Sequence, residues 1–391
     1  MKSLPFFLQG SLNNNDGSII RQTVISRPDV TPIVEGQTKG MVSKSMRPDR
    51  FEIRFFPVGD KTKGGDAILI QLFDFANKKH VVLIDGGYWA TGKQIISYLK
   101  KCSVEKIDYV ISTHFDNDHI GGIGEVISSD CISCGTLIMN DYNQSCLKYV
   151  EDQTQIGETL NESLEQAKNI RAIAQQRGID MIHPCGLTNP IWDCLYILGP
   201  SQNHMDKYVL GVYSEPVEEN VRMVENLSHS KFEKYDSTKE IQWDNKEKTS
   251  GINETSIVVA LKLGDLKFLF TGDVGKEGLN AALDKWESMG HLASEFTHIQ
   301  LPHHGSRKNI DLDIIRRLHK DGDSKKYLIS CPPQNPDLVH PSHRLINKIY
   351  EISPKSEIYC TAGKFLIVSK GMFEICSPAK SVPICPIMDA L

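Results

Sequence analysis

The sequence predicts an α/β fold in which helices and sheets pack in layers. Three strand-like segments follow one another at residues 51–56, 67–73 and 80–84, each rich in β-branched and aromatic residues. From residue 91 onward, helical and strand-like patterns alternate. Strands in series, followed by alternating helices and strands, indicate a mixed layered architecture. Clusters of His and Asp follow several of these strands, which places the chemistry at strand ends.

The remaining elements can be placed in order along the chain. Residues 91–100 carry apolar side chains at helical spacing, and residues 154–177 form a longer helix with one apolar stripe. A strand–turn–strand pattern around Gly264 predicts a β-hairpin. Further strands are expected at residues 107–111, 191–198, 297–301, 326–331, 357–369 and 372–376.

Composition favours an ordinary globular protein. The chain has 391 residues, of which 40% are hydrophobic, and a net charge of −5, so it fits one large or two modest units. This weakly acidic average provides no electrostatic footprint for nucleic acid. The ten cysteines are too scattered for a disulfide scaffold, and no signal peptide or membrane-spanning apolar run is visible. We therefore expect a cytoplasmic protein with reduced thiols and no membrane contact.

Two segments differ from the rest. Residues 1–50 are rich in Ser, Asn, Asp, Gly and Pro, so we expect an irregular N-terminal arm ahead of a single domain over residues 51–391. Residues 201–251 are polar and charged, and we interpret them as an insertion on the rim of the active site. Through these two segments the protein could bind a protein partner or a second copy of itself.

The most informative stretch is His-Phe-Asp-Asn-Asp-His-Ile-Gly-Gly at residues 114–122. It supplies four metal-competent side chains within six residues, directly after the buried strand at 107–111. A loop leaving that strand can turn His114 and Asp116 toward one centre, while Asp118 and His119 reach a second. Imidazole and carboxylate together suit Zn²⁺, Mn²⁺ or iron, whereas Mg²⁺ and Ca²⁺ would not need the histidines. Buried acids and histidines are costly without a cation, so the motif predicts a metal site.

This motif resembles the signature of the metallo-β-lactamase fold hydrolases. Together with Gly-Asp-Ala-Ile-Leu-Ile at residues 65–70 and Leu-Ile-Asp-Gly-Gly at residues 83–87, it is similar to the branch that includes the hydrolase domain of bacterial DNA-uptake competence proteins. The resemblance covers residues 51–377. It implies a four-layered αββα sandwich with an N-terminal extension and with metals held on loops that leave the strands.

The resemblance also implies roles for residues in the second half of the chain. Asp273, in a Thr-Gly-Asp turn after a strand, would bridge two metals. Of the adjacent His303 and His304, one would be a ligand and the other would contact substrate; we favour His303 as the ligand. His340 would lie in the pocket, although a helix starting after Ser342 explains that segment equally well.

Two aspartates in the first half have open roles. Asp85 would support the metal loop from behind the ligands, and Asp66 would lie near it in a turn. The alternative is that both only cap turns beside glycines.

The chain departs from the common family pattern at residues 251–256. Many members carry another histidine here, whereas this sequence reads Gly-Ile-Asn-Glu-Thr-Ser. The first metal is left with His114, Asp116 and Asp273, and any further ligand must come from a remote part of the chain. We therefore expect one or two Zn²⁺ ions, with Mn²⁺ or Mg²⁺ as alternatives at the second site.

We expect a metal-dependent hydrolase, and first a phosphodiesterase or nuclease that uses a metal-bound hydroxide. Metal binding lowers the pKa of water from about 15.7 to about 7, and two metals can clamp the attacking and leaving oxygens of a phosphodiester. Asp118, His304 and His340 are the candidate catalytic residues, and Arg307 or Lys308 could hold a phosphate. The acidic net charge leaves open a small-molecule ester, lactone or amide hydrolase. The arm and the insertion leave open a metal-stabilised interaction module without catalysis.

Overall fold

The computed structural model describes residues 46–140, 158–214, 249–334, 340–371 and 382–383. The first strand begins at Met46, inside the predicted arm. The rest of that arm, most of the predicted insertion and the predicted strand at 372–376 lie outside the described residues.

Two seven-stranded sheets form the centre of the domain. In the first sheet, the neighbours β3 and β4, β4 and β5, and β5 and β6 pair in parallel. In the second sheet, β9 and β10, β10 and β11, and β11 and β12 do the same. The first sheet has the order β13 (Leu366–Lys370), β1 (Met46–Phe55), β2 (Ile68–Asp74), β3 (Lys79–Ile84), β4 (Lys106–Ser112), β5 (Ser133–Met139) and β6 (Asp180–Ile182). The second has the order β14 (Val382–Pro383), β12 (Glu357–Cys360), β11 (Lys326–Ile329), β10 (His298–Gln300), β9 (Leu266–Phe270), β8 (Val258–Leu263) and β7 (Leu195–Gly199).

The sheets pack face to face through alternating apolar side chains. In β1, Phe51 and Phe55 point at the second sheet, where Phe51 meets Phe268 with ring centroids 5.8 Å apart. Val259 and Leu261 on β8 fill the same inter-sheet core. Since side chains alternate across a strand, the intervening residues face the helices instead.

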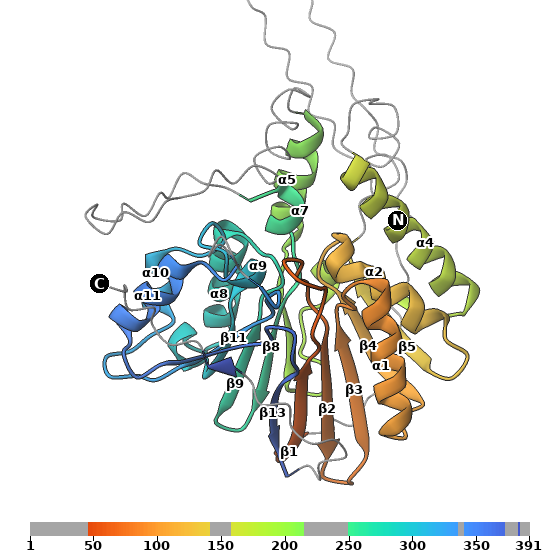
Figure 1. Ribbon diagram of the computed structural model, residues 1–391, viewed down its shortest axis with the longest axis horizontal. Coiled ribbons are helices and arrows are strands. Elements are labelled where there is room, and N and C mark those ends of the chain that lie inside the picture. Colours follow the sequence, from red (N-terminus) through yellow and green to blue (C-terminus); the bar gives the residue numbers. More distant parts are fainter. Residues whose placement is uncertain (1–45, 141–157, 215–248, 335–339, 372–381, 384–391) are drawn as a thin grey trace, which may run out of the picture. The chain divides into compact units, whose positions relative to one another are not determined.

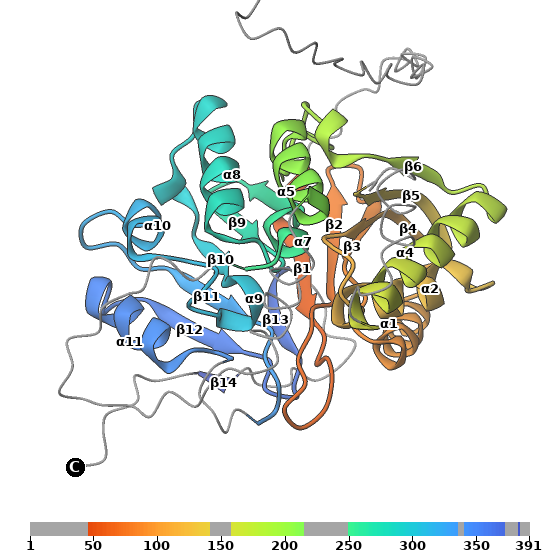
Figure 2. The ribbon, with the colours of Figure 1, turned by 90° about the horizontal axis from the view of Figure 1, so that it is seen from above.

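Helices cover both outer faces. α1, α2 and α4 pack on the first sheet, and α8, α10 and α11 pack on the second (Figures 1 and 2). The layers are therefore helix, sheet, sheet, helix, which confirms the αββα sandwich. The helices are α1 (Trp89–Lys101), α2 (Asn117–Ser128), α4 (Glu158–Gln176), α5 (Gln202–Ser214), α7 (Gly251–Glu254), α8 (Lys276–Ser288), α9 (Pro302–Gly305), α10 (Leu312–Arg317) and α11 (His343–Ile352), with 3₁₀ turns at Pro184–Gly186 and Ala293–Glu295. Within these described residues, none of the helices could cross a bilayer.

Several sequence predictions need correction. The strand predicted at 191–198 begins at Leu195, because Trp192 and Asp193 adopt positive φ in a tight turn. The sequence analysis placed the motif on a loop leaving the strand, whereas α2 begins at Asn117 and includes the second half of the motif.

The glycines in α2 have a packing role. A Cβ on Gly122 would lie 2.1 Å from the carbonyl oxygen of Gly86, and the Gly122 amide donates to Gly87 across a 2.7 Å bond. The turn after β3 thus lies directly against the helix. This close approach places Asp85, just before the turn, behind the metal motif.

We expect Gly122→Ala to destabilise the protein by about 1–3 kcal/mol, because the added methyl overpacks the contact with Gly86. Gly124→Ala is the matched control in the same helix: its nearest neighbour would be Ile170 at 3.7 Å, an ordinary contact. That change should stabilise by about 0.5–1 kcal/mol through helix propensity. Urea unfolding of both variants measures the difference, and equal midpoints would contradict the close packing.

Candidate metal centre

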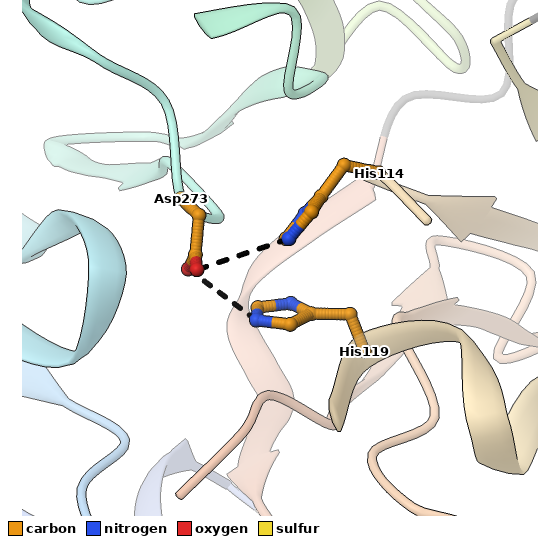
Figure 3. A group of neighbouring side chains, drawn as sticks. All are labelled: His114, His119 and Asp273. Atoms are coloured by element: carbon orange, nitrogen blue, oxygen red, sulfur yellow. Dashed lines mark ion pairs between the residues drawn. The ribbon is translucent and has the colours of Figure 1, made fainter. Parts of the chain in front are cut away.

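All the predicted site residues meet where the strands of the two sheets end. Loops after β4, β9, β10 and β11 converge at this edge, since parallel strands bring their carboxyl ends together. His114, His119 and Asp273 point toward one another (Figure 3). Four groups of described residues have ligand atoms within 4.8 Å of one another: His114, His119 and Asp273; Asp118, His119 and His304; Asp66, Asp273 and His304; and Asp66, Asp85 and His119.

Asp85 holds the motif from behind. One carboxylate oxygen accepts the Thr113 amide at 2.8 Å, and the other accepts the Thr113 hydroxyl at 2.7 Å and lies 2.9 Å from His119 Nδ1. The fully buried Asp85 is therefore more than a turn cap. It directs His119 Nε2 toward the site, which is how supporting carboxylates orient metal-binding histidines.

His114 is oriented through the same carboxylate. The Thr113 hydroxyl donates to Asp85, so it accepts from His114 Nδ1 at 3.0 Å. His114 Nε2 then faces Asp116 at 3.6 Å and Asp273 at 3.8 Å. Among the described residues, His114 shares a metal-capable group with His119 and Asp273 and not with Asp116, so the division of the motif into two centres stays a prediction.

Asp273 divides its two oxygens between neighbours. Oδ1 lies 3.3 Å from His119 Nε2, whereas Oδ2 lies 3.8 Å from His114 Nε2 and 3.6 Å from His303 Nε2. The side chain is almost fully buried, at 3% exposure. One carboxylate thus faces two adjacent positions, as a bridging ligand must.

His304 completes the second group. Its Nδ1 lies 3.0 Å from the Ser330 carbonyl, and its Nε2 lies 3.3 Å from Asp118 Oδ2. The metal-capable groups among the described residues contain His304 and not His303. The structure therefore favours His304 as ligand here, where the sequence analysis favoured His303. Both residues have positive φ (50° and 56°), a strained conformation for non-glycine residues that is typical of functional sites.

His340 lies beside the site without joining a metal-capable group. Its ring stacks on His303 with centroids 5.3 Å apart and lies 6.2 Å from the ring of His304. Ser342 does precede α11, but its side chain makes no capping hydrogen bond.

Sequence reasoning placed Asp66 near the metal loop but left it out of the ligand set. Asp66 is buried and belongs to two of the metal-capable groups; its Oδ2 accepts from Gln300 Nε2 at 2.8 Å. Gln300 could have indicated a buried polar residue such as Asp66, because a side-chain amide inside a short apolar strand needs a buried hydrogen-bond partner. Asn309, which contacts His303, was also missed and carried no visible signal in the sequence.

Buried polar atoms without hydrogen-bond partners indicate whether this site suits a cation. Within the metal-capable groups of the described residues, four buried atoms have no hydrogen-bond partner: His114 Nε2, His119 Nε2, Asp66 Oδ1 and Asp273 Oδ1. Buried polar atoms without partners are costly, and cations bound within these groups would satisfy them. The separations of 3.3 to 3.8 Å between facing ligand atoms are close to the roughly 3.3 Å between ligands of tetrahedral Zn²⁺. The donor set therefore fits a divalent metal.

The electrostatics favour positive charge. Burial opposes the charged form of His304, but Asp273 and Asp118 outweigh it and raise its pKa to about 9. Burial likewise opposes ionisation of Asp118, yet His119 and His304 lower its pKa to about 2. His303 differs, since burial outweighs Asp273 and lowers its pKa. Neighbouring carboxylates likewise raise the pKa of His114 and His119 against the effect of burial.

A family model agrees with this geometry. The model of the metallo-beta-lactamase superfamily matches residues 61–129, which include the motif and its supporting turn. Over this segment the chain is similar to the metallo-β-lactamase superfamily. This superfamily is hydrolytic and uses divalent metals. The resemblance to the competence-protein branch remains a prediction.

Three solved structures are similar to this chain at low identity. A Thermotoga maritima protein assigned to the metallo-β-lactamases is 11% identical, with a TM-score of 0.31, covering 57% of this chain and 79% of its own. The hydrolase AbOPH is 12% identical, with a TM-score of 0.29, covering 60% and 75%. A long-form RNase Z from yeast is 12% identical, with a TM-score of 0.38, covering 83% of this chain and 41% of its own. No curated protein sequence matches the chain.

We expect Asp85→Asn to weaken metal binding by about 10–100-fold, because the amide cannot accept from both Thr113 and His119. Asparagine tolerates the positive φ of this position, so the backbone should be kept. Asp74→Asn is the control: Asp74 also pairs with a buried histidine in the first sheet, His80 at 3.0 Å, but outside the metal-capable groups. Titration with Zn²⁺ should show normal affinity for the control alone.

Metal binding at neutral pH should release protons, because the raised pKa of His304 leaves it protonated until a cation displaces the proton. Affinity should therefore rise as the pH increases from 6 toward 9. Calorimetry at pH 7 in two buffers of different ionisation enthalpy measures the release. A binding enthalpy independent of the buffer would show that the histidines are already neutral.

Proposed function

We propose that this protein is a metal-dependent phosphodiesterase or nuclease that uses two divalent cations, with Zn²⁺ as the first candidate. One observation carries the proposal: the buried carboxylate of Asp273 faces two neighbouring ligand groups with different oxygens. Two cations on either side of one carboxylate would lie close enough to clamp both oxygens of an in-line phosphoryl displacement.

The residues divide into two sets around Asp273. His114 and Asp116 would hold one cation, and Asp118, His119 and His304 would hold the other. When bound, the metals would activate water at neutral pH and polarise the phosphoryl oxygens. Asp85 and the Ser330 carbonyl would orient His119 and His304 as ligands.

Three further residues would contact substrate. Arg307 and Lys308 are half-buried and follow the turn that carries His303 and His304, so they are placed to pair with phosphate. Burial and the neighbouring His303 and His304 lower the pKa of His340 to about 3. His340 would therefore act as a neutral hydrogen-bonding group and not as a cation.

Substrate screening distinguishes the proposal from its alternatives. The full chain is incubated with Zn²⁺ or Mn²⁺ and offered DNA, RNA, a chromogenic phosphodiester, and chromogenic ester, lactone and amide substrates. Metal-dependent cleavage of a phosphodiester is expected. Because the net charge is −5, turnover of only the neutral small substrates would favour the small-molecule hydrolase instead. Tight metal binding without any turnover would favour the interaction module.

We expect Asp273→Asn to lose one metal and at least about a hundredfold in turnover, since a neutral amide cannot replace a carboxylate between two cations. The fold should be retained. Asp265→Asn, on the exposed turn between β8 and β9, is the control and should keep wild-type turnover. Full activity of Asp273→Asn would remove Asp273 from the site.

A further inference from the structure

We propose that one rim of the metal centre binds single-stranded nucleic acid, through base stacking on Trp89 and phosphate contacts from Lys61 and Lys63. The proposal rests on the proposed phosphodiesterase function and names the class of its substrate. This basic-aromatic rim consists of two segments, the loop at residues 59–65 between β1 and β2 and the start of α1 at residues 88–89.

The loop at residues 59–65 lies directly against the metal motif. A Cβ on Gly65 would lie only 2.3 Å from the carbonyl oxygen of Asp118. The middle of the loop is held by a backbone hydrogen bond of 2.8 Å, in which the Gln334 amide donates to the Lys61 carbonyl. The loop is thus fixed beside a candidate metal ligand.

The exposed part of this loop is basic. Lys61 and Lys63 are both exposed, and neither forms an ion pair with another described residue. Asp60 is the one acid among residues 59–65, so the loop carries a net positive charge although the whole chain is acidic. Exposed cations beside a phosphodiester site can hold neighbouring phosphates. They provide a local footprint for nucleic acid that the average composition lacks.

Trp89 is exposed and yet held in place. It is 56% exposed, whereas tryptophan is highly buried on average. The indole Nε1 donates to Glu125 at 2.8 Å, and the Lys93 ammonium lies 3.5 Å from the centroid of the ring. A nucleobase stacks on such a preorganised ring at little entropic cost. Lys93 is then close enough to pair with a phosphate beside the stacked base.

Tyr88 connects Trp89 to the metal centre. A Cβ on Gly121 in α2 would lie 3.3 Å from its Cα, so this residue packs against the start of α2. Burial, together with the negative charges of Asp118 on the motif and Asp60 on the loop, raises the pKa of the Tyr88 phenol to about 12. The neutral phenol therefore lies in the field of both segments. A strand stacked on Trp89 passes it on the way to the metals.

Stacking on Trp89 favours a single strand over a duplex. Bases inside a duplex are covered on both faces by their neighbours, whereas the bases of a single strand can turn out and stack on an aromatic ring. DNA and RNA share this chemistry, so oligo(dT) and oligo(rU) are both probes of the rim.

The first test measures binding of fluorescein-labelled oligo(dT) and oligo(rU) to the full chain by anisotropy. It is carried out in chelator, which separates binding from cleavage, and again with Mn²⁺. We expect Trp89→Ala to raise the dissociation constant about tenfold through the loss of stacking, and Trp89→Phe to keep most of the affinity. The probe that binds more tightly identifies the preferred sugar.

The lysines are tested by the dependence of binding on salt. Each phosphate contact contributes about 0.7 to the slope of log affinity against log salt for a single strand. The double variant Lys61→Gln, Lys63→Gln should therefore lose about 1.4 from the slope. Trp89→Ala should keep the wild-type slope, because it removes stacking and no charge.

Phe75→Ala and Lys78→Gln are the matched controls. Phe75 is 70% exposed, and Lys78 is an exposed cation in the same turn between β2 and β3. This turn precedes β3, whereas Asp85 follows it, so the turn lies at the opposite end of the first sheet from the metal centre (Figure 1). Both controls should bind the probes with wild-type affinity.

Hydrolysis separates this proposal from the proposed function. With Mn²⁺, Trp89→Ala and the double lysine variant should keep wild-type turnover of a chromogenic phosphodiester too small to reach the rim. Their KM for an oligonucleotide should rise about tenfold. If the wild type binds single strands but hydrolyses no phosphodiester, the proposed function fails and the rim remains.

Three results would overturn the rim itself. An unchanged dissociation constant in Trp89→Ala would exclude stacking, and an unchanged salt slope in the double lysine variant would exclude the phosphate contacts. Tighter binding of a duplex than of either single strand would exclude the assigned substrate class. Each result can occur while the small phosphodiester is still hydrolysed.

Discussion

Buried negative charge at one edge of the sandwich is the constraint on which the rest of this structure depends. The side chains of Asp66, Asp85 and Asp273 are at most 3% exposed and belong to overlapping metal-capable groups. Isolated buried carboxylates would be too costly to keep ionised. Around them the protein gathers histidines whose second nitrogens are already engaged by Thr113, Asp85 and Ser330. A cation is the remaining component that balances the cluster.

The cluster also joins the two halves of the fold. The first sheet contributes the motif after β4, and the second contributes Asp273 after β9 and His304 after β10. Since neither half holds a complete ligand set, metal binding favours the assembled sandwich over any partly unfolded state. Stability and metal affinity are therefore linked in this protein.

Three residues that serve the site have a strained backbone. Asp85, His303 and His304 all have positive φ, and each is held by hydrogen bonds from a neighbouring loop. Strained conformations of this kind persist only when the surrounding structure determines them. The inter-sheet core of Phe51, Phe268 and their neighbours provides that rigid frame.

The sequence by itself determined the layered fold and the motif from His114 to His119, because alternating apolar residues and closely spaced ligands are local patterns. It did not show that Gly122 packs directly against the distant Gly86, which is a tertiary contact. Nor could it separate His303 from His304, which are chemically identical neighbours. Only the tertiary structure decides, because the left-handed turn directs one toward Asp273 and the other toward Asp118. Asn309 became visible only in three dimensions, because its partners lie 6 and 36 residues away along the chain.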